Sequence, residues 1–262
     1  MHGIAIVPGA GVGYTTNWRP NTTTLFDLKT LQPRHDIPTD KKPDAILHDT
    51  FTRRIFIFNN DGGTATVLEA ATGKVVGSVM LNGAPEAAVT DDNGLIFVNL
   101  EDKNEIVVFD AKTLQVKHRW ALGKGEEPTG LAFDKVRHRL FSTCHNNLMV
   151  VLDSQTGIVL ASVPIGSGVD GAVFDTSTGS AISSNGEGTM TVVREDTPGH
   201  FAAVQTIPTE RGARTITIDQ KSHHIFTITA QYGTAPAATT ENPRPRAPVV
   251  PGTFMALEYG VN

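Results

Sequence analysis

Short runs of apolar residues, each closed by polar or turn-forming residues, recur along the whole chain. Between residues 128 and 166 four such runs follow one another, at Leu131–Phe133, Leu140–Thr143, Leu148–Leu152 and Ile158–Ile165. The runs are rich in Val, Ile, Leu and Phe and are short enough for strands. Turn signals about every ten residues are typical of antiparallel all-β structure.

The pattern of strands and turns repeats every 41 to 44 residues. The residue just before the first strand of each unit forms one column, made of His2, Asp44, Glu86, Thr129, Asp170 and Arg214. A second column closes that strand, with Asp49, Asp91, Asp134, Asp175 and Asp219. A third ends the third strand, with Asp27, Glu69, Asp110, Asp153 and Glu195. The repetition of the second column in five units indicates a role in turns, not in chemistry.

Four antiparallel strands in about 42 residues predict a blade of a β-propeller. We expect one all-β domain over residues 1–262, with a solenoid as the second choice. The first strands should line a central channel and the fourth strands should face outward. The six units cover residues 1–43, 44–85, 86–128, 129–169, 170–213 and 214–262. The sixth unit lacks a fourth strand, which predicts a gap or an unpaired strand edge and, at that edge, self-association.

Composition narrows the class of protein. The 262 residues carry a net charge of -5, which argues against a general nucleic-acid binder. No run reaches the roughly 18 apolar residues of a membrane span. The N-terminal residues do not form a secretion signal as they stand. Cys144 is the one cysteine, so no intrachain disulfide can form; we expect it to be buried and inert despite its neighbour His145.

The repeats resemble those of the YVTN-type, YncE-like β-propellers. Units such as NEIVVFDAKTLQVKHRWALG and TATVLEAATGKVVGSVMLNG carry the likeness, as do NGEGTMTVVRED and ENPRPRAPVVPG. The resemblance implies a seven-bladed propeller, exported to the periplasm or the cell surface. Compared with that seven-bladed pattern, the six units predict a chain that lacks an N-terminal blade, or a six-bladed variant.

Propeller symmetry should bring the first column and the loops between second and third strands to one mouth of the channel. The residues expected there as ligand contacts are His2, Asp44, Glu86, Asn99, Glu101, His145, Asp170, Asn185, Glu187 and Arg214. Such polar residues form a plausible ligand site, although a solvated rim and turn caps explain the same pattern. No known catalytic motif is present, so no catalytic residue is assigned.

Two functions remain open from the sequence. The first is a non-enzymatic protein of the bacterial cell envelope that binds a small ligand, a peptide or a protein partner and needs no cofactor. The second is a metal-dependent lactonase or related hydrolase. There a divalent cation, Ca²⁺ or Mg²⁺, would be held by hard oxygen ligands from Glu86, Asn99, Asp170 and Asn185.

One long insertion departs from the repeat. Residues 231–252 are dense in Pro and Ala and predict neither strand nor helix. The segment leaves the same face as the mouth, so we expect a lid, a docking arm for a partner, or a simple tether. Arg244 and Arg246, with Arg211 and Arg214, would offset the acidic mouth or bind an anion.

Overall fold

The part of the chain that the structure describes folds into six antiparallel sheets, named blades 1 to 6 in chain order. The computed structural model describes all residues except 1, 238, 241–244, 246 and 261–262. Blade 1 contains β1 (Ile4–Val7), η1 (Pro8–Ala10), β2 (Val12–Asn17), β3 (Thr22–Asp27) and β4 (Pro33–Pro38). Blade 2 contains β5 (Pro43–Asp49), β6 (Arg54–Asn59), β7 (Thr64–Glu69) and β8 (Val75–Met80). Blade 3 contains β9 (Pro85–Thr90), β10 (Leu95–Leu100), η2 (Glu101–Lys103), β11 (Glu105–Asp110) and β12 (Val116–Ala121).

The remaining blades follow the same order of strands. Blade 4 contains β13 (Pro128–Asp134), β14 (Arg139–Cys144), β15 (Leu148–Asp153) and β16 (Val159–Pro164). Blade 5 contains β17 (Val169–Asp175), β18 (Ser180–Asn185), β19 (Thr189–Thr197) and β20 (His200–Pro208). Blade 6 contains β21 (Thr215–Ile218), β22 (Ile225–Thr229) and β23 (Met255–Tyr259). Within the described residues this last sheet has three strands and the other five have four, as the repeat predicted.

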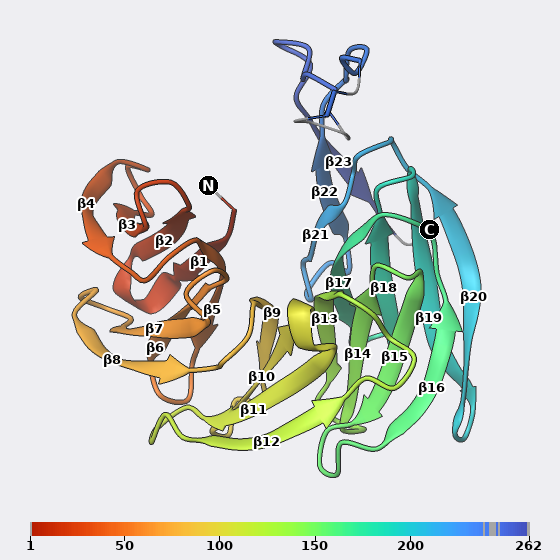
Figure 1. Ribbon diagram of the computed structural model, residues 1–262, viewed down its shortest axis with the longest axis horizontal. Helices are drawn as coiled ribbons and strands as arrows, with labels where there is room; N and C mark the ends of the chain where they lie inside the picture. Colours follow the sequence, from red (N-terminus) through yellow and green to blue (C-terminus); the bar gives the residue numbers. More distant parts are fainter. Residues whose placement is uncertain (1, 238, 241–244, 246, 261–262) are drawn as a thin grey trace.

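The first strands of the blades lie side by side around a common axis. Each contacts the next in chain order, from β1 and β5 through to β17 and β21. The later strands of each blade lie progressively farther from this axis (Figure 1). Blades 1 and 6, the first and last in chain order, are separated from each other in this arrangement (Figure 1). The architecture is therefore the predicted β-propeller.

Burial between blades holds the series together. The described residues form five clusters of buried apolar side chains, one between each pair of consecutive blades. Between blades 2 and 3, for example, Phe56 packs against Phe109 with ring centroids 5.5 Å apart. Apolar residues on a middle strand such as β10 alternate between the cluster shared with blade 2 and the cluster shared with blade 4. Both faces of these inner sheets are buried, which explains why strands such as β10 and β15 are apolar at nearly every position.

The aspartates that close the first strands hold turns, as predicted. Asp134 accepts hydrogen bonds from the backbone N–H groups of Val136 and Arg137 at 3.0 Å. Asp49 accepts from the Thr52 N–H at 2.8 Å and also from the Thr90 hydroxyl of the next blade at 2.7 Å. Asp49 thus links two blades as well as closing a turn.

The third column needs a correction in blade 5. In blade 4, Asp153 pairs with Arg139 across β14 and β15. The position that matches Asp153 in blade 5 is Arg194, which pairs with Ser180 across β18 and β19. The sequence alignment placed Glu195 there instead, because it followed the acidic side chain of the earlier units, whereas Glu195 lies one position farther along β19 and pairs with Phe201. The acidic column therefore covers blades 1 to 4, and blade 5 carries an arginine.

The insertion after β22 forms an arm. Its two ends run together through hydrogen bonds from Gly233 N–H to Pro248 O at 2.8 Å and from Val250 N–H to Gln231 O at 2.9 Å. One isolated bridge joins Tyr232 and Val249. The arm projects away from the blades (Figure 1). Among the residues described, no helix is both long and apolar enough to cross a membrane.

We expect Asp49→Ala to lower the free energy of unfolding by about 2–4 kcal/mol, because the partly buried Thr52 and the buried Thr90 of the next blade lose their acceptor. Asp219→Ala is the matched control, since Asp219 accepts from Lys221 N–H and Ser222 in an equivalent but exposed turn. It should cost about 1 kcal/mol or less. Urea unfolding measures both, and equal losses would contradict the link between blades.

Candidate binding site at the channel mouth

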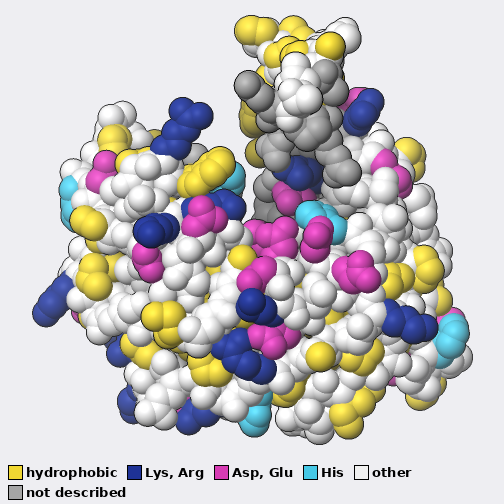
Figure 2. All heavy atoms as spheres, viewed as in Figure 1, with side chains coloured by type: hydrophobic (Ala, Val, Ile, Leu, Met, Phe, Trp, Pro, Cys, Tyr) yellow, Lys and Arg dark blue, Asp and Glu magenta, His cyan; other side chains and the backbone are white. Residues whose placement is uncertain are grey.

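Carboxylates gather where the first strands begin. Asp44, Glu86 and Asp170 each occupy the second residue of an inner strand, β5, β9 and β17. Glu101 opens η2, which follows β10 in blade 3. Side chains of Asp and Glu concentrate near the centre of this face of the molecule (Figure 2). The fold thus brings residues that are far apart in sequence to one opening.

Glu86 is the most perturbed of these carboxylates. Burial is the main cause that raises its pKa from 4.5 to about 8, and the nearby charges of Asp44, Glu101 and Asp170 contribute to the same shift. Its Oε1 accepts a hydrogen bond from Asn60 Nδ2 at 2.7 Å. Near neutral pH the group is therefore largely protonated, because ionisation would add another negative charge to a half-buried acidic cluster.

Asp44 and Asp170 each have a basic neighbour. Asp44 Oδ1 lies 3.3 Å from His2 Nδ1. Burial raises the pKa of Asp44, and the positive charge of His2 opposes that shift. Asp170 Oδ2 lies 3.6 Å from Arg214 Nε in blade 6. The six predicted residues His2, Asp44, Glu86, Glu101, Asp170 and Arg214 therefore occupy this mouth as one electrostatic group.

Two residues of the mouth, Lys42 and Trp18, were not predicted from the sequence. Lys42 Nζ donates to Asn60 Oδ1 at 2.8 Å and lies 5.6 Å from the centroid of the Trp18 ring. Trp18 also meets the His2 ring edge to face at 5.6 Å, and it is 46% exposed. Lys42 precedes the column residue Asp44 by two positions, a place that the column alignment did not cover.

Asn99 and Asn185 are fully buried and engaged in the fold. Asn185 Nδ2 donates to Thr189 and Thr191 on β19, both at 3.0 Å. Its Oδ1 accepts from Ser183 at 3.0 Å. Asn99 Nδ2 donates to two backbone carbonyls of β13 and its Oδ1 accepts from Ser142 at 3.0 Å. A cation bound through these two side chains would have to replace those bonds.

The bonds of Asn185 belong to a repeated device. Asn59 and Asn17 end the second strands of blades 2 and 1, and each donates to two threonines of the third strand. This repetition marks a structural role. Among the residues that the structure describes, no three His, Cys, Asp or Glu side chains are arranged to hold a metal ion.

The remaining predicted residues belong to the rim. His145 Nδ1 lies 3.2 Å from Glu127 Oε2. Glu187 accepts from the Ser167 hydroxyl at 2.7 Å, and this hydrogen bond is the main reason that its pKa is lowered. Arg244 and Arg246 lie outside the described residues.

Cys144 is buried, as the sequence predicted. Burial raises the pKa of its thiol to about 12. The thiolate, which is the nucleophilic form, is therefore strongly disfavoured at neutral pH. Cys144 and His145 consequently do not form a thiolate–imidazole pair.

The pKa of Glu86 predicts a pH dependence of stability. Folding raises this pKa from 4.5 to about 8, so the folded protein binds more protons than the unfolded chain between these values. The stabilisation is complete below the unfolded pKa and is lost as the pH rises through the folded one. We expect Glu86→Gln to remove this decline and to be more stable than the wild type at pH about 9.

Urea unfolding at pH about 5, 7 and 9 measures this effect. Glu187→Gln serves as the control, because the lowered pKa of Glu187 makes its contribution to stability constant above the unfolded pKa, and that contribution is lost only in more acidic solutions. Parallel pH profiles for the wild type and Glu86→Gln would contradict the account of the mouth.

Asn185→Ala should destabilise the fold by about 1–3 kcal/mol, because the buried hydroxyls of Ser183 and Thr191 lose their partner. Asn17→Ala makes the same change at a partly exposed site and should cost clearly less. Thermal unfolding compares the two variants. If both variants lose almost no stability, the hydrogen bonds of these asparagines are not needed for the fold.

Comparisons with known proteins agree with the fold. No protein-family model matches the chain. The chain is 24% identical to the uncharacterized protein YncE of Escherichia coli O157:H7 over 148 residues, which cover 52% of this chain and 42% of that protein. The match thus spans less than half of the relative. A chain of Kuenenia stuttgartiensis hydrazine synthase superposes with a TM-score of 0.73 at 12% identity, over 86% of this chain and 72% of that one. These findings, with the six sheets around one axis, show a β-propeller with a distant likeness to YncE.

Proposed function

We propose that this chain is a non-enzymatic binding protein whose channel mouth takes a positively charged group. That group would belong to a small ligand or to a side chain of a peptide or protein partner. The observation that carries the proposal is the meeting of Asp44, Glu86, Glu101 and Asp170, whose charges act on one another at one opening.

Electrostatics favours a cation over other ligands at this place. The charges of Asp44 and Asp170 help to keep Glu86 protonated, and a bound cation would relieve their repulsion. Trp18 adds an exposed aromatic ring at the edge of the mouth, and such rings attract cations. Lys42, which already lies over this ring, is the cation that a ligand would displace.

The likeness to YncE supports two finer proposals. We place the chain among the YncE-like propellers, on the basis of the repeat columns and the partial match. From the resemblance of its repeats to those of the exported YVTN-type propellers, we also propose a location in the cell envelope. Fractionation of the host cell tests this, because recovery of the protein with cytoplasmic markers alone would contradict it.

Agmatine, which carries an ammonium and a guanidinium group, is a suitable probe for the mouth. We expect binding that tightens from pH about 6 to 9 and releases protons near neutrality, because the cation favours the ionised form of Glu86. Isothermal titration calorimetry in buffers of different ionisation enthalpy measures both effects.

Variants at the mouth test the assignment. Glu86→Gln should abolish the proton release, and Asp170→Asn should weaken agmatine binding about tenfold, as expected for the loss of a charged partner. Asp92→Asn makes the same change of charge in the turn after β9, beside Lys135 on the opposite face, and should leave binding unchanged. Equal effects of the three variants, or no binding by the wild type, would contradict the proposed function.

A further inference from the structure

A hollow of about 400 Å³ lies between blades 3 and 4. It is bordered by the β9–β10 turn of blade 3 and by the β13–β14 and β15–β16 turns of blade 4. Turns that follow first and third strands lie at the same end of a blade, so the hollow is on the face opposite the channel mouth. Phe97 and Phe133 are buried and line it with rings whose centroids lie 5.3 Å apart.

Blade 3 presents two aromatic side chains to this hollow. Trp120 and His118 lie on the same face of β12, with ring centroids 5.6 Å apart and an interplanar angle of 18°. Strand pairing matches Trp120 with aliphatic residues in three other blades, namely Ile37, Val79 and Val163. The packing of neighbouring blades therefore does not require an aromatic ring at this position.

Gly157 of blade 4 makes room for the tryptophan. A Cβ at this residue would overlap the Trp120 ring, so a glycine is needed for the ring to lie against the backbone. The matching turn residue of blade 3 is Leu114, whose side chain packs between blades 2 and 3 and lies over Gly77. Gly77 in turn matches His118. Between blades 2 and 3 a leucine thus occupies the space that is open between blades 3 and 4.

Ser154 adds a buried hydroxyl to the lining of the hollow. The residue is 5% exposed, and its hydroxyl makes no hydrogen bond with any residue that the structure describes. The matching residues of blades 2 and 3 are Ala70 and Ala111, which pack in the clusters shared with the preceding blades. A buried hydroxyl without a partner lowers stability, whereas alanine at this place does not. Ser154 therefore indicates a bound group that can form a hydrogen bond.

The other polar side chains of the hollow favour an uncharged ligand. Asn93 and Gln155 line it, and their amide groups have no hydrogen-bond partner among the described residues. Asp91 Oδ1 already accepts from two backbone N–H groups of its own turn, both at 2.8 Å. Lys135 forms an ion pair with Asp92. The two charged side chains of the lining are thus opposite in sign and engaged, and neutral amides remain available.

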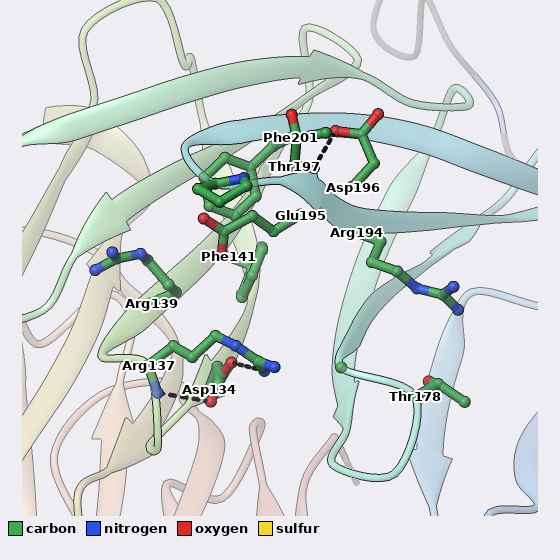
Figure 3. Close-up of a pocket in the computed structure, with 12 residues that line it drawn as sticks. Asp134, Arg137, Arg139, Phe141, Thr178, Arg194, Glu195, Asp196, Thr197 and Phe201 are labelled. Atoms are coloured by element: carbon green, nitrogen blue, oxygen red, sulfur yellow. Dashed lines mark hydrogen bonds and ion pairs between the residues drawn. The ribbon is translucent and has the colours of Figure 1, made fainter.

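A hollow of about 410 Å³ at the matching place between blades 4 and 5 has a different lining (Figure 3). Its rings are Phe141 and Phe201, and most of its polar side chains are charged. Asp134 pairs there with Arg137 at 3.1 Å, and Arg194 points away from the phenyl rings (Figure 3). Neutral amide and hydroxyl groups beside a tryptophan therefore distinguish the hollow between blades 3 and 4.

We propose that the hollow between blades 3 and 4 binds a planar, uncharged aromatic heterocycle with hydrogen-bonding groups on its edge. The ring packs among the aromatic side chains of Trp120, His118 and Phe97. Its edge meets the Ser154 hydroxyl and the rim amides, which can both donate and accept. The volume is in the range of small-molecule sites, which combine apolar walls with a few placed polar groups.

Adenine, uracil and nicotinamide are the probes, and myo-inositol is the comparison because it has a polar edge without an aromatic ring. Isothermal titration calorimetry on the full chain should show saturable binding of at least one probe, about tenfold or more tighter than that of myo-inositol. Trp120→Val restores an aliphatic residue and should weaken this binding about tenfold. Trp18→Val makes the same change at the channel mouth and should leave it unchanged. The chain has two tryptophans, so the fluorescence of this control comes from Trp120 and should change as the probe saturates.

Milder variants protect the test from effects on folding. Ser154→Ala restores the residue of blades 2 and 3 and should weaken binding about threefold, whereas Ser78→Ala on exposed β8 should have no effect. Gln155→Trp fills the hollow from an exposed turn and should abolish binding. Ala71→Trp, at the matching turn position of blade 2, should leave binding unchanged.

Four outcomes overturn the proposal. None of the three probes binds saturably, or myo-inositol binds as tightly as the best probe. Gln155→Trp leaves binding unchanged. Trp18→Val weakens binding as much as Trp120→Val, which would place the ligand at the channel mouth instead.

Discussion

Burial of both faces of each inner sheet is the constraint on which the structure depends. A blade of four short strands is too small to form a core alone, so its apolar faces must be covered by the neighbouring blades. The five clusters between consecutive blades meet this need. Because each blade repeats the geometry of the last, equivalent residues arrive at equivalent distances from one axis.

That geometry has an electrostatic consequence. The residues that begin the inner strands come together at the channel mouth whether their charges attract or repel one another. Asp44, Glu86 and Asp170 are separated by more than 40 residues along the chain, yet their charges act on one another. The turn before the first strand does not require an acidic residue at this position, since Thr129 occupies the same position in blade 4. An acidic mouth therefore costs stability without helping the turns, which is typical of a functional site.

The sequence predicted the blades well because period and strand pattern are local properties. Apolar runs, closing aspartates and the spacing between them can all be read from one sequence. The strands lie where these signals predicted them. The site was harder, because side-chain partners are set by neighbours in space. Asn99 and Asn185 were predicted to be ligands. In the fold both are buried, and their amide groups donate to backbone carbonyls and to threonine hydroxyls, respectively. Lys42 and Trp18 lay outside the aligned columns, and only the folded chain brings them together.

The error at Glu195 is informative for the same reason. The sequence alignment followed the acidic side chain of the earlier units, and it therefore chose Glu195 over its neighbour Arg194. Strand pairing restores the true register and places Arg194 where the earlier blades have an acid. In a repeat protein the shared positions serve the fold, since each unit needs them equally. Blades 1 to 4 form without the arginine at this position and without the long hairpin, so the shared needs of the repeat explain neither feature of blade 5.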